Sequence, residues 1–296
     1  MPAPPRLPPD WPHRAHSRQV RAGGLLWHVQ VFEGPRPDAP LALLLHGTGA
    51  SSHSWRGLAP LLAREYRVVV PDLPGHAYTE RPARDAALGL AGMAAAVGEL
   101  LRGLDSQPIQ PALVVGHSAG AAIAARLCLD SPWQPAALLS LNGAWFPPAG
   151  SGRWWYAPMA KMLVFNPLVP RFFAWHASRP ATLQRLLHST GSRLSAEGQA
   201  LYGRLVADPA HVGGVLAMMA QWDLRPLLRD LPRLACPLHL VAAAADHTVP
   251  PAQAQAVARL VPGAQVHRLA GLGHLAHEEA PEQIAHLLQK LKAHPD

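Results

Sequence analysis

Short apolar runs alternate along this chain with longer stretches in which apolar residues recur at helical spacing. Strands are predicted at 41–45, 68–70, 113–115, 136–141, 238–241 and 266–269. Helices are predicted at 54–66, 85–104, 253–260 and 281–292, and another helix, rich in alanine, begins after residue 118. The strands are continuous apolar blocks, as in a sheet that is covered on both faces. Such alternation predicts an α/β fold with a mostly parallel, doubly wound sheet. Residues 17–33 alternate in polarity around Gly23 and Gly24, which predicts an antiparallel hairpin at one edge of that sheet.

The alternation breaks between residues 145 and 222, where helical segments are interrupted by prolines and no β-rich run appears. We therefore expect a core domain of residues 1–144 and 223–296, with 145–222 inserted as a helical cap. The cap has seven basic and two acidic residues, which account for most of the chain's net charge of +7. It also holds five of the nine tryptophans.

The composition of the cap supports three interpretations. Its aromatic residues either form the cap's own core, with arginines in solvent, or line a lid over a bulky apolar substrate that carries carboxylates. In the second case the substrate-binding candidates are Trp145, Trp154, Phe172 and Trp222. Alternatively, the aromatics at 154–156 and 172–173 make a peripheral membrane contact.

Overall composition limits the remaining possibilities. The two cysteines indicate a reducing compartment, so we expect a cytoplasmic protein. The basic charge comes mainly from arginines without a lysine-rich tract, so nucleic acid is not an expected partner. No group of residues has convincing metal-ligand spacing, and we expect neither a metal nor another cofactor. Residues 1–12 contain six prolines and no apolar core of a signal peptide, and this arm either docks through Trp11 or is disordered.

The run from Leu113 to Gly120 carries the most specific chemical signal. A buried strand leads into Gly116-His117-Ser118-Ala119-Gly120, the G-x-S-x-G pattern of a nucleophile elbow. In such an elbow the serine sits in a strained turn at the N-terminus of a helix, and the flanking glycines prevent collisions across the turn. The alternative is a glycine-rich turn with a solvated serine, which is common in α/β proteins.

Two later residues complete a catalytic pattern. Asp246 and His274 each follow a predicted strand, in the order nucleophile, acid, histidine that α/β hydrolases use. His274 would take the proton of Ser118, and Asp246 would orient the imidazole. The backbone amides of Thr48, in a glycine-rich loop after strand 41–45, and of Ala119 would form the oxyanion hole.

Each of these residues also has a structural interpretation. Asp246 could cap the following helix, and His274 could be a capping or core histidine. The alternative acid position, after strand 136–141, is occupied by Asn142, which has no charge to offer an imidazolium. We interpret His46 and Asp72 as structural residues that support their loops.

These motifs resemble the α/β-hydrolase superfamily over nearly the whole chain. The matching segments are residues 46–49, 72–76, 116–120, 246 and 273–274. Residues 10–18, 24–30 and 46–56 are similar to the magnesium-chelatase accessory proteins of bacteriochlorophyll biosynthesis. Two departures are Ala77 and Ala243, which stand where glycine is usual in the superfamily.

The resemblance implies a cytoplasmic bacterial protein that acts near tetrapyrroles, with magnesium chelatase or a pigment enzyme as partner. We therefore expect a serine hydrolase of the carboxylesterase type that acts on a bulky, hydrophobic and anionic substrate. The alternative is a non-catalytic accessory that binds a tetrapyrrole or chelatase subunits on a hydrolase scaffold. A perhydrolase or a C–C bond hydrolase is a weaker third alternative, since the same triad supports both.

Overall fold

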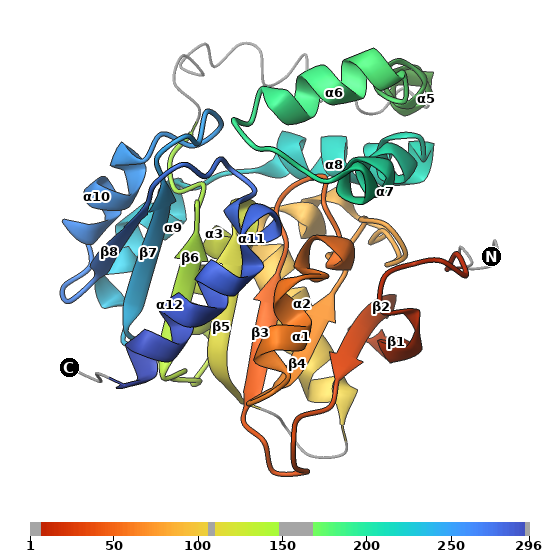
Figure 1. Cartoon of the computed structure of the whole chain (residues 1–296). Helices are drawn as coiled ribbons and strands as arrows, with labels where there is room; N and C mark the ends of the chain where they lie inside the picture. The colour runs from red at the N-terminus through yellow and green to blue at the C-terminus, as the bar shows by residue number, and fades with distance from the viewer. Residues whose placement is uncertain (1–6, 106–109, 148–167, 294–296) are drawn as a thin grey trace.

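A single sheet of eight strands runs through the molecule. The computed structural model describes residues 7–105, 110–147 and 168–293. The strands are β1 (Ser17–Ala22), β2 (Leu25–Phe32), β3 (Leu41–Leu45), β4 (Arg67–Pro71), β5 (Pro111–His117), β6 (Ala137–Leu141), β7 (Leu238–Ala243) and β8 (Gln265–Leu269). They lie in the order β1-β2-β4-β3-β5-β6-β7-β8 (Figure 1). The pairs β1–β2 and β2–β4 are antiparallel and the other five are parallel, so the prediction of a mostly parallel sheet is confirmed.

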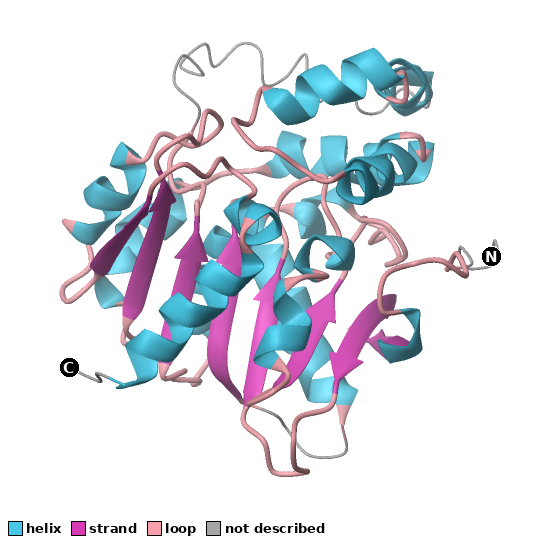
Figure 2. Cartoon of the chain, in the orientation of Figure 1, coloured by secondary structure: helices cyan, strands magenta, loops and turns pink. Residues whose placement is uncertain are grey.

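Helices cover both faces of the sheet (Figure 2). They are α1 (Leu58–Leu62), α2 (Leu90–Leu104), α3 (Ala119–Asp130), α5 (Leu168–Ala177), α6 (Pro180–His188), α7 (Ala196–Val206), α8 (Pro209–Gln221), α9 (Arg225–Asp230), α10 (Ala252–Ala258), α11 (Ala276–Glu279) and α12 (Pro281–Ala293). Apolar side chains of α1 and α12 pack on one face in one hydrophobic cluster, and those of α2, α3, α9 and α10 pack on the other face in a second cluster. Burial on both faces explains why β3 and β7 are apolar at nearly every position.

Two predicted helices are shorter than the sequence pattern indicates. The segment expected as one helix from residue 85 begins as a 3-10 turn, Asp85–Leu88, and becomes α2 only after Gly89. Gly89 is extended, with φ −69° and ψ 167°, and this interrupts the helix. Likewise, Ser52–Trp55 is a 3-10 turn that precedes α1.

The N-terminal arm docks on the body from residue 7 onward. Trp11 is 2% exposed and packs against Leu201 and Leu205 of α7. Asp10 forms an ion pair with Arg204 of the same helix, with 2.9 Å between Oδ1 and Nη1. Of the two alternatives for the arm, the structure therefore supports docking through Trp11 for the part of the arm that it describes.

The insertion between β6 and β7 supplies α5 to α8, which lie beyond the carboxyl ends of the parallel strands (Figure 1). In doubly wound sheets, ligands bind at this end of the strands. The sequence candidates for catalysis follow β3, β5, β7 and β8 and meet there. Among the helices that the structure describes, none is long and apolar enough to cross a membrane.

Candidate active site

Ser118 occupies a strained turn between β5 and α3. Its φ of 52° and ψ of −118° are rare for a residue with a side chain. Such a conformation costs on the order of 1–3 kcal/mol and is found mainly at functional positions. A Cβ on Gly116 would lie 2.4 Å from the carbonyl oxygen of Gly120, and one on Gly120 would lie 2.2 Å from that of Leu45. The elbow therefore needs glycine at both positions.

The loop after β3 runs directly beside this serine. A Cβ on Gly47 would lie 3.0 Å from the Cβ of Ser118, so the loop after β3 and the turn at Ser118 are in contact at this point. Thr48 is exposed, and Ala119 is the first residue of α3. Within the described part of the chain, no acceptor is paired with the backbone N–H of either residue. Both N–H groups are therefore unpaired in the described structure, as the predicted oxyanion hole requires.

Asp246 and His274 form a buried pair at the ends of β7 and β8. The Nδ1 of His274 lies 2.7 Å from Oδ2 of Asp246, and the two side chains are 7% and 1% exposed. Oδ1 of Asp246 accepts hydrogen bonds from the backbone N–H groups of Thr248 and Val249, each at 2.8 Å. Because an ionised carboxylate only accepts, His274 carries its proton on Nδ1 and leaves Nε2 free to receive another.

The loop after β8 that carries His274, the histidine loop, also contacts the turn at Ser118. Nε2 of His117 donates to the carbonyl oxygen of His274 at 2.9 Å, and the two rings are 4.7 Å apart between centroids. Among the hydrogen bonds of the described residues, none joins the Ser118 hydroxyl to the His274 imidazole. Such bonds are often long or poorly aligned in resting enzymes and shorten when substrate binds.

The inserted segment contributes a contact that the sequence patterns did not reveal. The carbonyl oxygen of Thr190 accepts from the N–H of His247 at 3.3 Å and from that of His274 at 3.1 Å. The hydroxyl of Ser192 accepts from the N–H of Leu275 at 2.8 Å. Residues 190–192 thus connect the loop after β7, which carries Asp246, with the histidine loop after β8. The sequence offers no motif there, because the contacts are mostly to the backbone.

His46 and Asp72 support their loops, as expected. Nε2 of His46 accepts from the N–H of Leu73 at 2.9 Å, which joins the loops after β3 and β4. Asp72 is fully buried, which by itself would raise its pKa. Its contacts with His28 and with the N–H of Ser52, at 2.8 and 2.7 Å, nevertheless hold the pKa of Asp72 well below its ordinary value.

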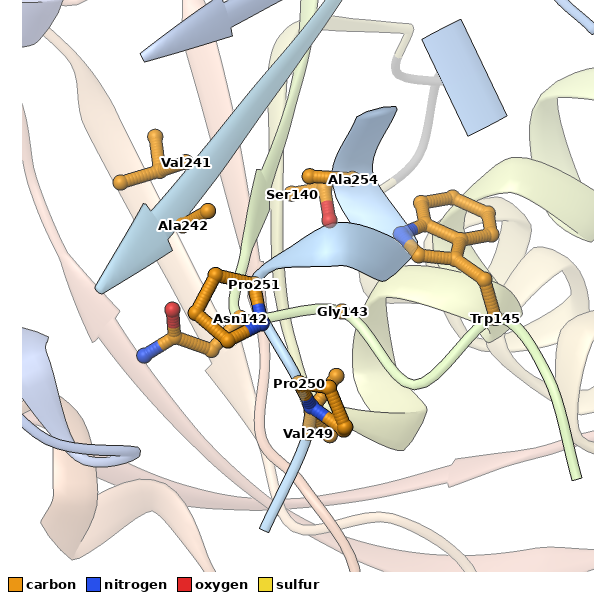
Figure 3. A pocket seen from close by; sticks show the side chains of 10 residues that line it. All are labelled: Ser140, Asn142, Gly143, Trp145, Val241, Ala242, Val249, Pro250, Pro251 and Ala254. Atoms are coloured by element: carbon orange, nitrogen blue, oxygen red, sulfur yellow. The ribbon is translucent and has the colours of Figure 1, made fainter. Parts of the chain in front are cut away.

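The substrate-binding candidates do not gather in one place. Trp145 is 1% exposed and belongs to the core cluster that includes α2 and α3. Its indole nitrogen points toward the hydroxyl of Ser140 across a small cavity (Figure 3). Trp222 is half-buried against the same cluster, whereas Phe172 is 60% exposed on α5. Trp154 lies outside the described residues.

Comparison of the sequence with known proteins identifies a protein family and a relative. Residues 40–281 match the model of the alpha/beta hydrolase fold family. The chain is 40% identical over 290 residues to the magnesium-chelatase 30 kDa subunit of Rhodobacter capsulatus, an alignment that covers 95% of this chain and 96% of that protein.

Solved structures show the same fold at low sequence identity. An esterase from Exiguobacterium antarcticum superposes with a TM-score of 0.71 at 18% identity, over 93% of this chain and 99% of that one. The epoxide hydrolase CorEH superposes with a TM-score of 0.74 at 23% identity, over 94% and 98% of the two chains. The fold therefore does not select one reaction, and the side chains at the site must do so.

Proposed function

Because this chain belongs to the alpha/beta hydrolase fold family and is a relative of the magnesium-chelatase 30 kDa subunit, we propose that it is a serine hydrolase of tetrapyrrole metabolism. Ser118 would be the nucleophile, His274 the general base and Asp246 the residue that orients His274. The observation that carries this proposal is the 2.7 Å contact between Nδ1 of His274 and Asp246, beside a serine with strained backbone angles.

The proposed reaction is acyl transfer to water. Nε2 of His274 takes the proton of the Ser118 hydroxyl while Oγ of Ser118 bonds to the ester carbonyl carbon. The N–H groups of Thr48 and Ala119 stabilise the oxyanion, and loss of one such donor typically lowers kcat by about 10²–10³. His274 returns the proton to the leaving alcohol, and water then releases the acyl group by the same steps. A serine at this position disfavours epoxide opening, which needs a carboxylate nucleophile.

Labelling with a fluorophosphonate tests the nucleophile. The wild-type protein should be labelled, and Ser118→Ala should not be. Ser140→Ala is the matched control, because Ser140 is buried near the same end of the sheet and should leave labelling unchanged. Absence of labelling in a folded wild-type protein would refute the catalytic proposal and favour a non-catalytic chelatase accessory.

The substrate would be a bulky, hydrophobic ester with anionic groups, such as a tetrapyrrole derivative. The supporting observations are the name of the relative and three exposed arginines in α5 and α6 and between them, Arg171, Arg179 and Arg185. Titration with a protoporphyrin, followed by quenching of tryptophan fluorescence, tests tetrapyrrole binding. Hydrolysis of p-nitrophenyl esters graded by acyl length separates catalysis from binding alone, and co-purification with chelatase subunits tests the partner.

We also propose a peripheral membrane contact through the outer face of α5. Leu168, Phe172, Phe173 and Trp175 are 49–62% exposed there, and no acidic residue occurs between 168 and 196. The Arg179 guanidinium lies 3.9 Å above the Trp175 ring. Aromatic side chains and arginines together suit an anionic lipid surface.

Sedimentation with vesicles tests this contact. Phosphatidylglycerol vesicles should bind the protein in a salt-sensitive manner, and phosphatidylcholine vesicles should bind it less. Trp175→Ser should weaken binding, whereas Leu260→Ser, at an exposed leucine beyond α10, should not. Equal binding of both variants would refute the assignment of this face.

A further inference from the structure

Asn142 follows β6, at the position where an alternative catalytic acid would stand. The residue is 4% exposed, and its side-chain amide makes three hydrogen bonds to backbone groups. None of these contacts is to the imidazole of His274. The role of Asn142 must therefore differ from that of a displaced acid.

The three bonds connect two loops that the proposed mechanism uses. Nδ2 donates to the carbonyl oxygens of Gly273 and His274, at 3.0 and 2.8 Å. Oδ1 accepts from the N–H of Ala243 at 2.8 Å, and Ala243 ends β7 three residues before Asp246. Because the Ala243 amide can only donate and the two carbonyls can only accept, the orientation of the Asn142 amide is determined.

His117 reinforces this clamp from the elbow side. Its Nε2 donates to the carbonyl oxygen of His274 that Asn142 also binds. Burial lowers the pKa of His117, which keeps the ring neutral beside His274. The carbonyl of His274 thus receives one donor from the end of β5 and one from beyond β6.

We propose that Asn142 is a positioning residue, whose amide holds the His274 loop in register with the strand that leads to Asp246. This inference rests on the proposed function for its effect on turnover, but not for its effect on the His274 loop. Without the amide, the N–H of Ala243 and the carbonyl of Gly273 lose their partner in a buried site, and the histidine loop loosens. A shift of about 1 Å in such a group is enough to slow catalysis by roughly 10²-fold.

The backbone of Asn142 has φ 47°, so a simpler explanation is that asparagine merely tolerates this left-handed conformation. Asn142→Gly separates the two explanations, because glycine keeps the backbone and removes the amide. Asn142→Asp is a second variant of the same size. It keeps an acceptor for Ala243 and replaces both donors with an oxygen that repels the carbonyls of residues 273 and 274.

The test measures kcat and KM for a p-nitrophenyl ester, together with the NMR signal of the His274 Nδ1 proton. In both variants, kcat should fall about 10–100-fold with KM changed less than about threefold. The Nδ1 proton signal should broaden because the proton exchanges faster with water. Ala77→Gly, at another left-handed position with φ 43°, is the control and should change neither quantity.

The two readouts separate failure of this inference from failure of the proposed function. An inactive wild-type protein whose Nδ1 proton signal still depends on Asn142 would refute the hydrolase and leave the positioning role standing. Unchanged kcat and an unchanged Nδ1 proton signal in the folded Asn142→Gly or Asn142→Asp protein would overturn the positioning role.

Discussion

At the scale of single residues, the site depends on the direction of its hydrogen bonds. Oδ1 of Asp246 is committed to the N–H groups of Thr248 and Val249, so only Oδ2 faces His274. Because the carboxylate can only accept, the contact at Oδ2 selects the His274 tautomer with its proton on Nδ1. In the proposed reaction, Nε2 is then the nitrogen that acts on Ser118.

The replacement Asp246→Asn tests this dependence. The amide oxygen of asparagine would stay with Thr248 and Val249, and its NH₂ group would face Nδ1 of His274. His274 would then carry its proton on Nε2, the wrong tautomer for a base. We expect kcat to fall by about 10⁴-fold, because the imidazole is held in the wrong tautomer, with little loss of stability. Ester hydrolysis and thermal unfolding check the two parts, and kcat within tenfold of wild type would contradict the assignment.

At the scale of elements, the close packing of α3 on β3 and β5 explains the small residues after the elbow. The helix begins at Ala119, and Ala121, Ala122, Ala124 and Ala125 are fully buried. Gly120 faces the carbonyl oxygens of Leu45 and His46 at the end of β3. The position of Ser118 therefore depends on how closely a helix approaches two strands.

A methyl group at position 120 should separate these elements. Gly120→Ala would place Cβ 2.2 Å from the carbonyl oxygen of Leu45, so the helix must shift. We expect destabilisation of about 1–3 kcal/mol or more, together with loss of fluorophosphonate labelling. Gly98→Ala in α2 is the control: the nearest atom there is 3.5 Å away, and alanine should stabilise the helix by about 0.5–1 kcal/mol. Unfolding by urea compares the two variants, and equal stabilities would contradict the packing argument.

At the scale of the whole molecule, several buried histidines make folding sensitive to acid. Burial lowers the pKa of His46, His76 and His277 to about 3 and that of His211 to about 4. In the unfolded chain these groups titrate near 6.5. Glu278 has the opposite effect, because burial raises its pKa to about 7 despite its contacts with Arg56 and Tyr202.

The sign of the pH dependence follows from these shifts. Below pH 6.5 the unfolded chain binds protons that the folded histidines do not, so each histidine removes up to about 1.4 kcal/mol of stability per pH unit. Four histidines outweigh the one opposing glutamate between pH 6.5 and 4. We expect Tm to fall steeply over this range, and a constant Tm down to pH 5 would contradict it. His277→Met should reduce this slope, because it removes one of the histidines with a lowered pKa. Neither ring nitrogen of His277 has a partner among the described residues, so the replacement breaks no hydrogen bond there.

The cap shows where sequence patterns stop being informative at this scale. Apolar runs and proline spacing predicted the sheet and the inserted helices. Burial of a strand on two faces and the periodicity of a helix both leave a pattern within a short stretch of sequence. The contact of Thr190 with the loops that hold Asp246 and His274 was not predictable, because it uses a carbonyl group that every residue carries. The aromatic content of the cap likewise did not predict that Trp145 would lie in the core behind the sheet.

By itself, the sequence determined the α/β architecture, the elbow at Ser118 and the identity of the candidate acid and base. Each of these is set by a local rule: strand burial, glycine at a tight turn, or a polar residue at the end of a strand. Only the tertiary structure decided that Asp246 meets His274 through Nδ1 and that the N-terminal arm packs on α7. Tertiary contacts also decided which backbone groups the Asn142 amide binds, those of Ala243, Gly273 and His274. The physical reason is that hydrogen bonds between distant loops depend on where the folded backbone brings donors and acceptors together, which no local pattern encodes.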